Sequence, residues 1–189
     1  MARISSKASI AIDREFNMAH RATLTNHIDA LKTEVLTILR FQAAHKRIFE
    51  FEDIQKISRI EFADRIIALK AIENDLVVRI CKFADDTRGV HSFLKAIREF
   101  PSSSLNGPET MRKINEFQSS IKYIKKRRHE KLAHLKIGEL DDEYVPERDL
   151  LPVIKLIVEI IDLMCNEKVN YLWSDGRYEK YDLREIVGI

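Results

Sequence analysis

Apolar residues recur at steps of three and four along most of the chain, which is the period of an amphipathic helix. The first such series is Ile28, Leu31, Val35, Ile38 and Phe41 or Gln42. It predicts a long helix over residues 13–48. The preceding residues, 1–12, mix Ser, Lys and Ala without a clear period, so we expect a loose arm there and ordered structure from near Asp13.

A second apolar series predicts another long helix after a short connection. Its members are Ile54, Ile57, Ile60, Ala63, Ile67, Ile72, Leu76, Ile80 and Phe83. Asp53 stands just before the series and is the candidate N-cap, because its carboxylate can accept hydrogen bonds from the free N–H groups of a first turn. The two long helices are expected to form a hairpin.

Three shorter helical patterns follow. Val90, Leu94 and Ile97 predict a short helix that ends before Pro101. After a loop at 102–108, the next buried series is Met111, Ile114, Phe117, Ile121 and Ile124, continued in register by Arg128, Leu132 and Leu135. The last series is Leu150, Ile154, Ile157, Ile161 and Met164 or Cys165. The tail, 174–189, is apolar enough to dock, with a second subunit as one available surface.

The composition favours helices. Hydrophobic residues make up 45% of the 189 residues and charged residues 33%, while Gly occurs 5 times and Pro 4 times. So few turn-forming residues argue against a β-sandwich and against disorder, and the length suits a single domain with a real core. We therefore expect one all-α domain over residues 1–189.

Charge is segregated along the chain, although the formal net charge is only +2. Residues 112–136 contain nine Lys or Arg and two Glu, which makes them a segment that attracts phosphate. Residues 139–149 contain six acids and one Arg, and these can neutralise the basic segment in the folded protein. Two solvated surfaces that pair locally are the simpler interpretation of the same pattern.

Two cysteines, Cys81 and Cys165, lie in apolar helical series without a spaced framework, and we interpret them as reduced core residues. No apolar run suits a signal peptide, and no uncharged stretch is long enough for a membrane helix. We expect a cytoplasmic protein without contact to a membrane.

The patterns of several common sites are missing from the sequence. His129 and His134 flank a Glu but are five residues apart, so they lie about 140° apart on a helix and do not fit a zinc-protease motif. His20 and His27 share a helix face, but no ligand nearby completes a metal site. The chain also has no Gly-rich phosphate loop and no nucleophile elbow. We therefore expect no metal and no cofactor.

The most informative stretch is Lys-Lys-Arg-Arg-His-Glu-Lys-Leu-Ala-His at 125–134, in which Arg128 precedes His134 by six residues. An imidazole moves a proton near neutral pH, and a guanidinium holds a charged phosphate. Together they are the minimal apparatus for cutting RNA without a metal.

This stretch resembles the motif of the HEPN superfamily, small helical proteins whose signature is an Arg, four to six residues, and a His. The ending Arg-x-x-x-Leu-Ala-His, from Arg128 to His134, is similar to the form common in the abortive-infection type. A second likeness is Ile-Glu-Asn-Asp-Leu at 72–76 leading into Ala-Asp-Asp at 84–86, similar to the helix ending in Asp that precedes the motif in that group. The resemblance covers residues 20–170.

The resemblance implies a bundle of four main up-and-down helices plus a short extra helix. It also implies a homodimer in which two motifs form one cleft and cut single-stranded RNA, leaving 2′,3′-cyclic phosphate ends. Such a ribonuclease fits a toxin or phage-defence system with a neutralising protein partner. His134 would shuttle the proton, Arg128 or Arg127 would stabilise the charged phosphate, and His129 would assist. The residues expected to hold the RNA backbone are Lys125, Lys126 and Lys131.

The spacing alone has little specificity, because three other pairs in this chain satisfy it. They are Arg14 and His20, Arg21 and His27, and Arg40 and His45. Geometry also leaves the working arginine open: on a regular helix Arg128 and His134 lie about 120° apart, whereas Arg127 and His134 share a face. Either the helix is distorted at the motif, or the reach of Arg128 closes the gap, or Arg127 is the working residue.

Two other functions compete with cleavage. The first is a non-catalytic helical module, HEPN-like or plain, that dimerises and binds a protein or nucleic acid partner through a solvated basic helix end. The second is a nucleotide-binding sensor that uses the same basic cleft. The position of His134 relative to a dimer cleft distinguishes the ribonuclease from the binding module.

Overall fold

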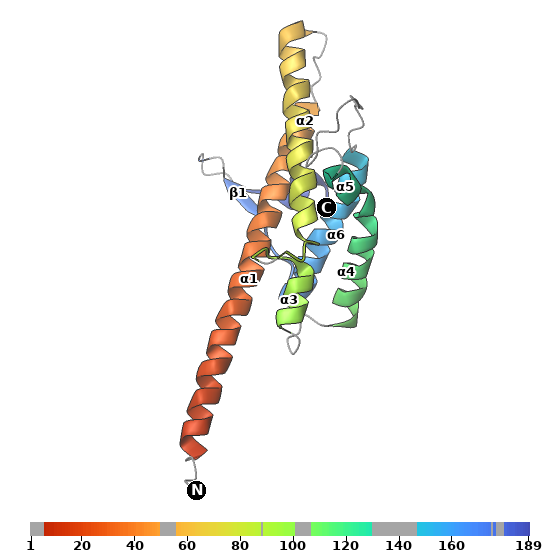
Figure 1. Cartoon of the computed structure of the whole chain (residues 1–189). Helices are drawn as coiled ribbons and strands as arrows, with labels where there is room; N and C mark the ends of the chain where they lie inside the picture. Colours follow the sequence, from red (N-terminus) through yellow and green to blue (C-terminus); the bar gives the residue numbers. More distant parts are fainter. Residues whose placement is uncertain are drawn as a thin grey trace.

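The computed structural model describes residues 6–49, 56–87, 89–100, 107–129, 147–174, 176 and 180–189. For 6–22, 49, 147 and 148 it describes the backbone alone. The described residues are mostly helical, which confirms the predicted helical class, with one small sheet in addition. Figure 1 shows long helices running along one direction, with shorter helices beside them.

Two long helices, α1 (Ser6–Phe49) and α2 (Arg59–Lys82), form the predicted hairpin and pack against each other. α1 begins at Ser6, so the expectation of a loose arm over 1–12 is corrected for residues 6–12. The N-cap of α2 is Ser58, whose hydroxyl accepts a hydrogen bond from the N–H of Glu61 at 3.1 Å. The candidate cap Asp53 lies outside the described residues.

The remaining helices close a core against this hairpin. They are α3 (Phe93–Glu99), α4 (Pro108–Ser120), α5 (Lys122–Arg127), α6 (Glu147–Cys165) and α7 (Leu183–Val187). α6 packs between α1 and α4, and its apolar series is buried as predicted. Each fully buried Leu, Ile or Phe contributes about 1.5–3 kcal/mol to folding, so this core holds the short helices in place.

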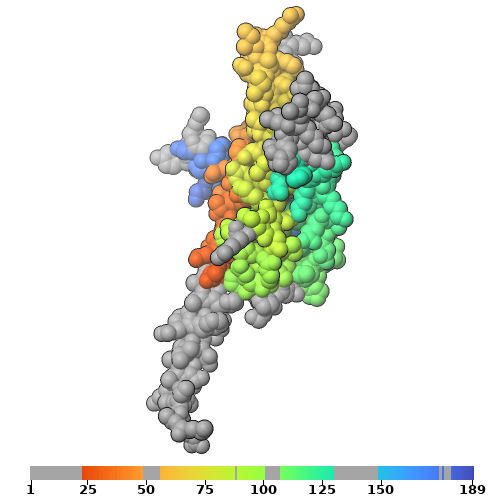
Figure 2. Space-filling view, in the orientation of Figure 1, coloured from red at the N-terminus to blue at the C-terminus, as the bar shows by residue number. Residues whose placement is uncertain are grey.

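The predicted apolar series of α2 does not stay on one face. Leu76, Ile80 and Phe83 are buried as expected, but Ile60 is 76% exposed and Ile67 is 65% exposed. The step of five residues from Ile67 to Ile72 turns the series by about 140°, so its first half leaves the buried side. The N-terminal half of α2 stands beyond the rest of the described surface in Figure 2.

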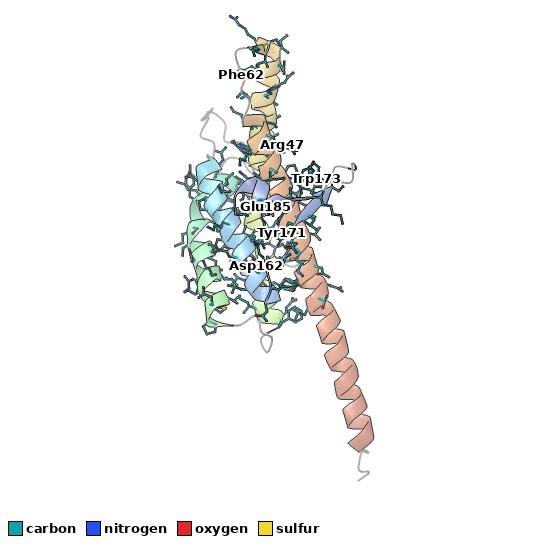
Figure 3. All side chains as sticks on the ribbon, turned by 180° about the vertical axis from the view of Figure 1, so that it is seen from behind. Arg47, Phe62, Asp162, Tyr171, Trp173 and Glu185 are labelled. Atoms are coloured by element: carbon teal, nitrogen blue, oxygen red, sulfur yellow. The ribbon has the colours of Figure 1, made fainter. Side chains whose placement is uncertain are left out.

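The C-terminal tail docks on its own chain. Strands β1 (Leu172–Ser174) and β2 (Lys180–Asp182) pair antiparallel, and α7 packs on α1. Lys46 Nζ donates to the carbonyl of Ile186 at 3.2 Å, and Arg47 lies over the ring of Trp173. Arg47 and Trp173 are labelled in Figure 3, which shows the molecule from behind. The tail therefore docks on α1 of its own chain, and the hairpin of strands is an element that helical periodicity did not predict.

Candidate functional site

The basic stretch singled out by the sequence lies where two helices end. α4 passes into α5 through a turn at Ile121, and α5 contacts the C-terminal part of α2. Arg128, the C-cap of α5, keeps α-helical backbone angles, and its N–H donates to the carbonyls of Ile124 and Lys125. The helical backbone thus continues to the motif arginine. His134 lies outside the described residues, so the three explanations for the motif geometry stay predictions.

Arg128 is held by a carboxylate from the end of α2. Its Nη1 lies 3.6 Å from Oδ2 of Asp85, and its side chain remains 35% exposed. The other oxygen of Asp85 accepts hydrogen bonds from the N–H of Thr87 at 3.1 Å and from its hydroxyl at 2.5 Å. The Thr87 hydroxyl, with a smaller contribution from Arg128, lowers the pKa of Asp85. An ionised, oriented carboxylate therefore anchors a guanidinium that still reaches solvent.

Lys125 makes a second contact with the same helix end. Its Nζ donates to the carbonyl of Ala84 at 3.2 Å. Ala84 follows Phe83, the C-cap of α2, so the ammonium group lies at the negative end of the helix dipole and stabilises it. Part of the basic charge predicted to hold RNA is thus engaged by the protein itself.

Cys81 lies in the core below these two cations. Burial raises the pKa of its thiol, and the nearby charges of Arg128 and Lys125 offset only part of that effect. A thiol kept protonated is a poor nucleophile. The site therefore offers cations and, at its end, an imidazole, but no activated cysteine.

Asp86, next to Asp85, holds a different arginine. Both of its carboxylate oxygens accept from Arg98 of α3, at 2.6 and 3.1 Å. Two adjacent acids at the end of α2 thus tie down α5 and α3 separately. Of the two acids in the Ala-Asp-Asp segment at 84–86, Asp85 pairs with the motif arginine, Arg128, and Asp86 pairs with Arg98.

The remaining motif residues differ in their surroundings. Arg127 is half-buried, and its Nε is enclosed without a hydrogen-bond partner among the described residues. Lys126 and His129 are exposed. The candidate catalytic residue His134 and the candidate RNA-binding residue Lys131 lie outside the described residues, so the distance between Arg and His stays a prediction.

Two of the other Arg-to-His spacings end in core histidines. His27 is 2% exposed, and its Nε2 lies 3.1 Å from the carbonyl of Ser92. His45 is buried on α1, and its Nε2 lies 3.0 Å from Oε1 of Glu73 on α2. These two buried imidazoles connect α1 to neighbouring segments. Their contacts give them a structural role, so we do not take them as candidate catalytic residues.

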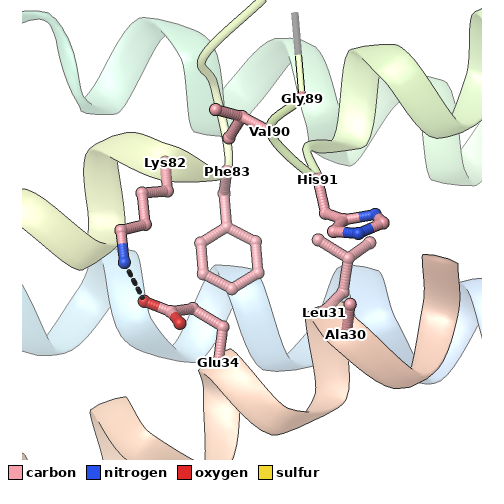
Figure 4. Close-up of a pocket in the computed structure, with 8 residues that line it drawn as sticks. All are labelled: Ala30, Leu31, Glu34, Lys82, Phe83, Gly89, Val90 and His91. Atoms are coloured by element: carbon pink, nitrogen blue, oxygen red, sulfur yellow. Dashed lines mark hydrogen bonds and ion pairs between the residues drawn. The ribbon is translucent and has the colours of Figure 1, made fainter. Parts of the chain in front are cut away.

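A pair of histidines was missed by the sequence interpretation. Nδ1 of His91, in the segment before α3, lies 2.8 Å from Nδ1 of His27. Beside it is a pocket of about 320 Å³ between α1 and that segment, lined by Glu34, Lys82 and Phe83 among others (Figure 4). Only the fold brings the two histidines together, because no spacing or periodicity links them.

Within the described ranges, no three His, Cys, Asp or Glu side chains gather as metal ligands would. Along the same residues, we find no helix with the length and apolar character needed to cross a membrane. Comparison of the chain with protein-family models, with curated proteins and with solved structures finds no match. The functional argument therefore rests on the chain's own residues.

Proposed function

We propose that this protein is a metal-independent endoribonuclease that cuts single-stranded RNA as a homodimer. Its composite site takes Arg128 and His134 from each copy, with Arg127 and His129 as neighbours. A toxin or phage-defence role with a neutralising protein partner belongs to the same proposal.

The ion pair between Arg128 and Asp85 is the observation that carries the proposal. An arginine that must stabilise a transition state has to be fixed in advance, because its binding energy is otherwise lost in ordering the side chain. Asp85 supplies that fixation, and the exposed part of the guanidinium keeps donors available to a phosphate.

In the proposed reaction the ribose 2′-hydroxyl attacks the adjacent phosphorus, and the bond from phosphorus to the 5′-oxygen breaks. The products are a 2′,3′-cyclic phosphate and a free 5′-hydroxyl. One His134 of the dimer takes the proton of the 2′-hydroxyl, and the other gives a proton to the leaving oxygen. The arginines stabilise the extra charge on the phosphorus oxygens, and loss of such a contact costs about 10²–10³-fold in rate. Lys126 and Lys131 hold the backbone of the RNA.

A specific observation favours the non-catalytic binding module as a second candidate. Arg128 and Lys125 both contact the end of α2, through Asp85 and through the carbonyl of Ala84. Contacts of this kind also serve simply to pack a basic helix end onto its neighbour. In this alternative, the exposed cations bind a protein or a nucleic acid without chemistry.

Incubation of the purified protein with single-stranded RNA in EDTA separates the two candidates. The ribonuclease predicts cleavage with cyclic phosphate ends, abolished by His134→Ala. Arg98→Ala is the matched control, since it also removes an arginine paired with an aspartate at the end of α2 but lies outside α5. The ribonuclease is rejected if the wild-type protein binds RNA without cutting it, or if the His134→Ala variant cuts as well as wild type. The binding module then remains as the proposed function.

A further inference from the structure

The outer side of α2 carries a continuous row of small and apolar residues. We call it the outer stripe, and its members are Ile60, Ala63, Ile67, Ala71, Asn74 and Val78. The steps of three, four, four, three and four keep these residues on one side of the helix. That side differs from the buried one, because Ile60, Ile67 and Val78 are 76%, 65% and 37% exposed; Phe62 and Ile66, on other sides of α2, are 44% and 38% exposed. A soluble helix rarely leaves such a row uncovered unless something packs on it.

Charges flank the outer stripe with opposite signs on its two edges. At 100° per residue, Arg59 and Lys70 lie about 80–100° to one side of Ile60. Asp64 and Asp75 lie about 40–60° to the other side. Asp75 already accepts from Arg79 of the next turn, but its side chain is 39% exposed and keeps room for a second donor. Between residues 59 and 75 the helix therefore has one basic and one acidic edge along its exposed apolar row. Beyond them, Arg79 and Lys82 lie on the acidic side and pair with Glu34 of α1.

We propose that a second copy of this chain covers the outer stripe, with the two α2 helices parallel about a two-fold axis. In a parallel pair, the basic edge of each helix faces the acidic edge of the other, and facing residues are five positions apart. Arg59 then meets Asp64 of the second copy, and Lys70 meets Asp75 of the second copy. An antiparallel two-fold pair would bring like edges together, and like charges opposite each other are unfavourable.

Two further features of the outer stripe fit this arrangement. Asn74 is the one polar member, and a single Asn in such a seam fixes the register and number of strands, because it can hydrogen-bond to its own copy. The spacing repeats every eleven residues, from Ile60 to Ala71 and from Ile67 to Val78. Eleven residues in three turns give 3.67 per turn, so the helices pack almost straight with a slight right-handed supercoil.

A parallel pair has a consequence for the basic site. It brings the C-terminal ends of both α2 helices, each with its Asp85 and Arg128, to the same end of the axis. An antiparallel pair would separate them by the length of the helix. The pairing is inferred from α2 alone and does not rest on the proposed ribonuclease activity.

Disulfide trapping tests the orientation. In a parallel pair, Ile60→Cys and Ile67→Cys should each form a disulfide with the same residue of the second copy under mild oxidation. Glu61→Cys, exposed on the same turn but about 100° away, should not, and wild-type protein reports the background from Cys81 and Cys165. Ile60→Cys that links only when mixed with Val78→Cys would overturn the parallel arrangement. A strict monomer at micromolar concentration in light scattering would overturn the inference altogether.

A charge exchange tests the flanking pairs. Arg59→Asp should weaken the dimer by about tenfold in Kd, because it places two acids opposite each other in both symmetric positions. Adding Asp64→Arg should restore the affinity, and both positions are exposed, so the fold should be unaffected. Arg65→Asp, on the other side of the helix, is the control and should leave the Kd unchanged. No weakening by Arg59→Asp, or no rescue by the double variant, would remove the charge argument.

These measurements need no RNA. A dimer with same-residue disulfides that cuts no RNA would overturn the proposed function and leave the pairing intact. If the protein cuts RNA but gives only antiparallel disulfides, the parallel pairing is overturned and the proposed function stands.

Discussion

Arg128 and Asp85 are far apart in the sequence, yet Nη1 of the arginine lies 3.6 Å from Oδ2 of the aspartate. The pair joins α5 to the end of α2, and it fixes the arginine of the candidate motif. Asp85 is itself fixed by Thr87, so the arginine is oriented through a chain of three residues.

Asp85→Asn should lower RNA cleavage by about tenfold or more while changing stability by less than about 1 kcal/mol. The variant loses the charge that orients Arg128, but partly exposed ion pairs contribute little to folding. Single-turnover cleavage and urea unfolding measure the two effects. Asp86→Asn is the matched control, because it weakens the pair with Arg98 and leaves α5 untouched. Equal losses of activity in both variants would point to a general disturbance at the end of α2.

Arg128→Ala and Arg127→Ala should separate the two arginines. The Asp85 contact favours Arg128 as the residue that stabilises the phosphate, so Arg128→Ala should reduce the cleavage rate by about 10²–10³-fold. Arg127→Ala should instead act mainly on stability, because this side chain is half-buried. Cleavage rate and thermal midpoint, measured on both variants, test this division. A large loss of rate only in Arg127→Ala would mean that the helix runs regularly into the motif.

Lys125→Ala and Lys126→Ala should differ although the residues are adjacent. Lys126 is exposed, so its loss should reduce the slope of log affinity for RNA against log salt by up to about 0.7, the value for one phosphate contact to a single strand. Lys125 donates to the carbonyl of Ala84, so its loss should also lower the free energy of unfolding, by about 0.5–1 kcal/mol. Salt titrations and urea unfolding of the two variants measure these effects. An unchanged salt slope in both would remove these lysines from the RNA path.

Burial lowers the pKa of His27. The hydrogen bond to the carbonyl of Ser92 opposes that shift, as does the charge of Glu99, whereas His91 and Lys95 add to it. The folded protein therefore takes up this proton at a lower pH than the unfolded chain, in which the histidine pKa is about 6.5. The contribution of His27 to the free energy of unfolding is fully present above about pH 6.5, and it is lost as the pH falls through the pKa of His27 in the folded state.

The free energy of unfolding should therefore decrease below about pH 6.5, with His27 contributing at most about 1.4 kcal/mol per pH unit. In His27→Gln the slope should be smaller, because the side chain no longer titrates. Urea unfolding at intervals between pH 5 and about pH 8 measures the slope. Equal slopes in wild type and His27→Gln would contradict the assignment.

The helical class and most helix positions could be predicted because period and burial agree in this chain. Ile154, Ile157 and Ile161 repeat at helical steps, and all are buried in α6. α2 shows the limit of that inference, because Ile60 and Ile67 continue the same series and face solvent. The step of five residues from Ile67 to Ile72 moves the series to another side of the helix, so apolar residues at mixed steps do not identify one buried face.

The site was only partly predictable for a similar reason. Arg128 was found from its motif, and the acids at 84–86 were found from the same resemblance. Neither pattern states that Asp85 pairs with Arg128 and Asp86 with Arg98, because that depends on how α2, α3 and α5 meet. The pairing of His27 with His91 had no signal in the sequence, since only tertiary packing brings the two rings together.

The docking of α7 on α1 joins the two ends of the described chain. Leu183 and Val187 are buried, and Lys46 reaches across to the carbonyl of Ile186. During translation, α1 is made before α7, so its packing cannot be complete until residues 183–187 have been synthesised. Contacts of such sequence separation slow folding more than they affect final stability. Until α7 is made, the surface of α1 that α7 covers stays exposed on the nascent chain.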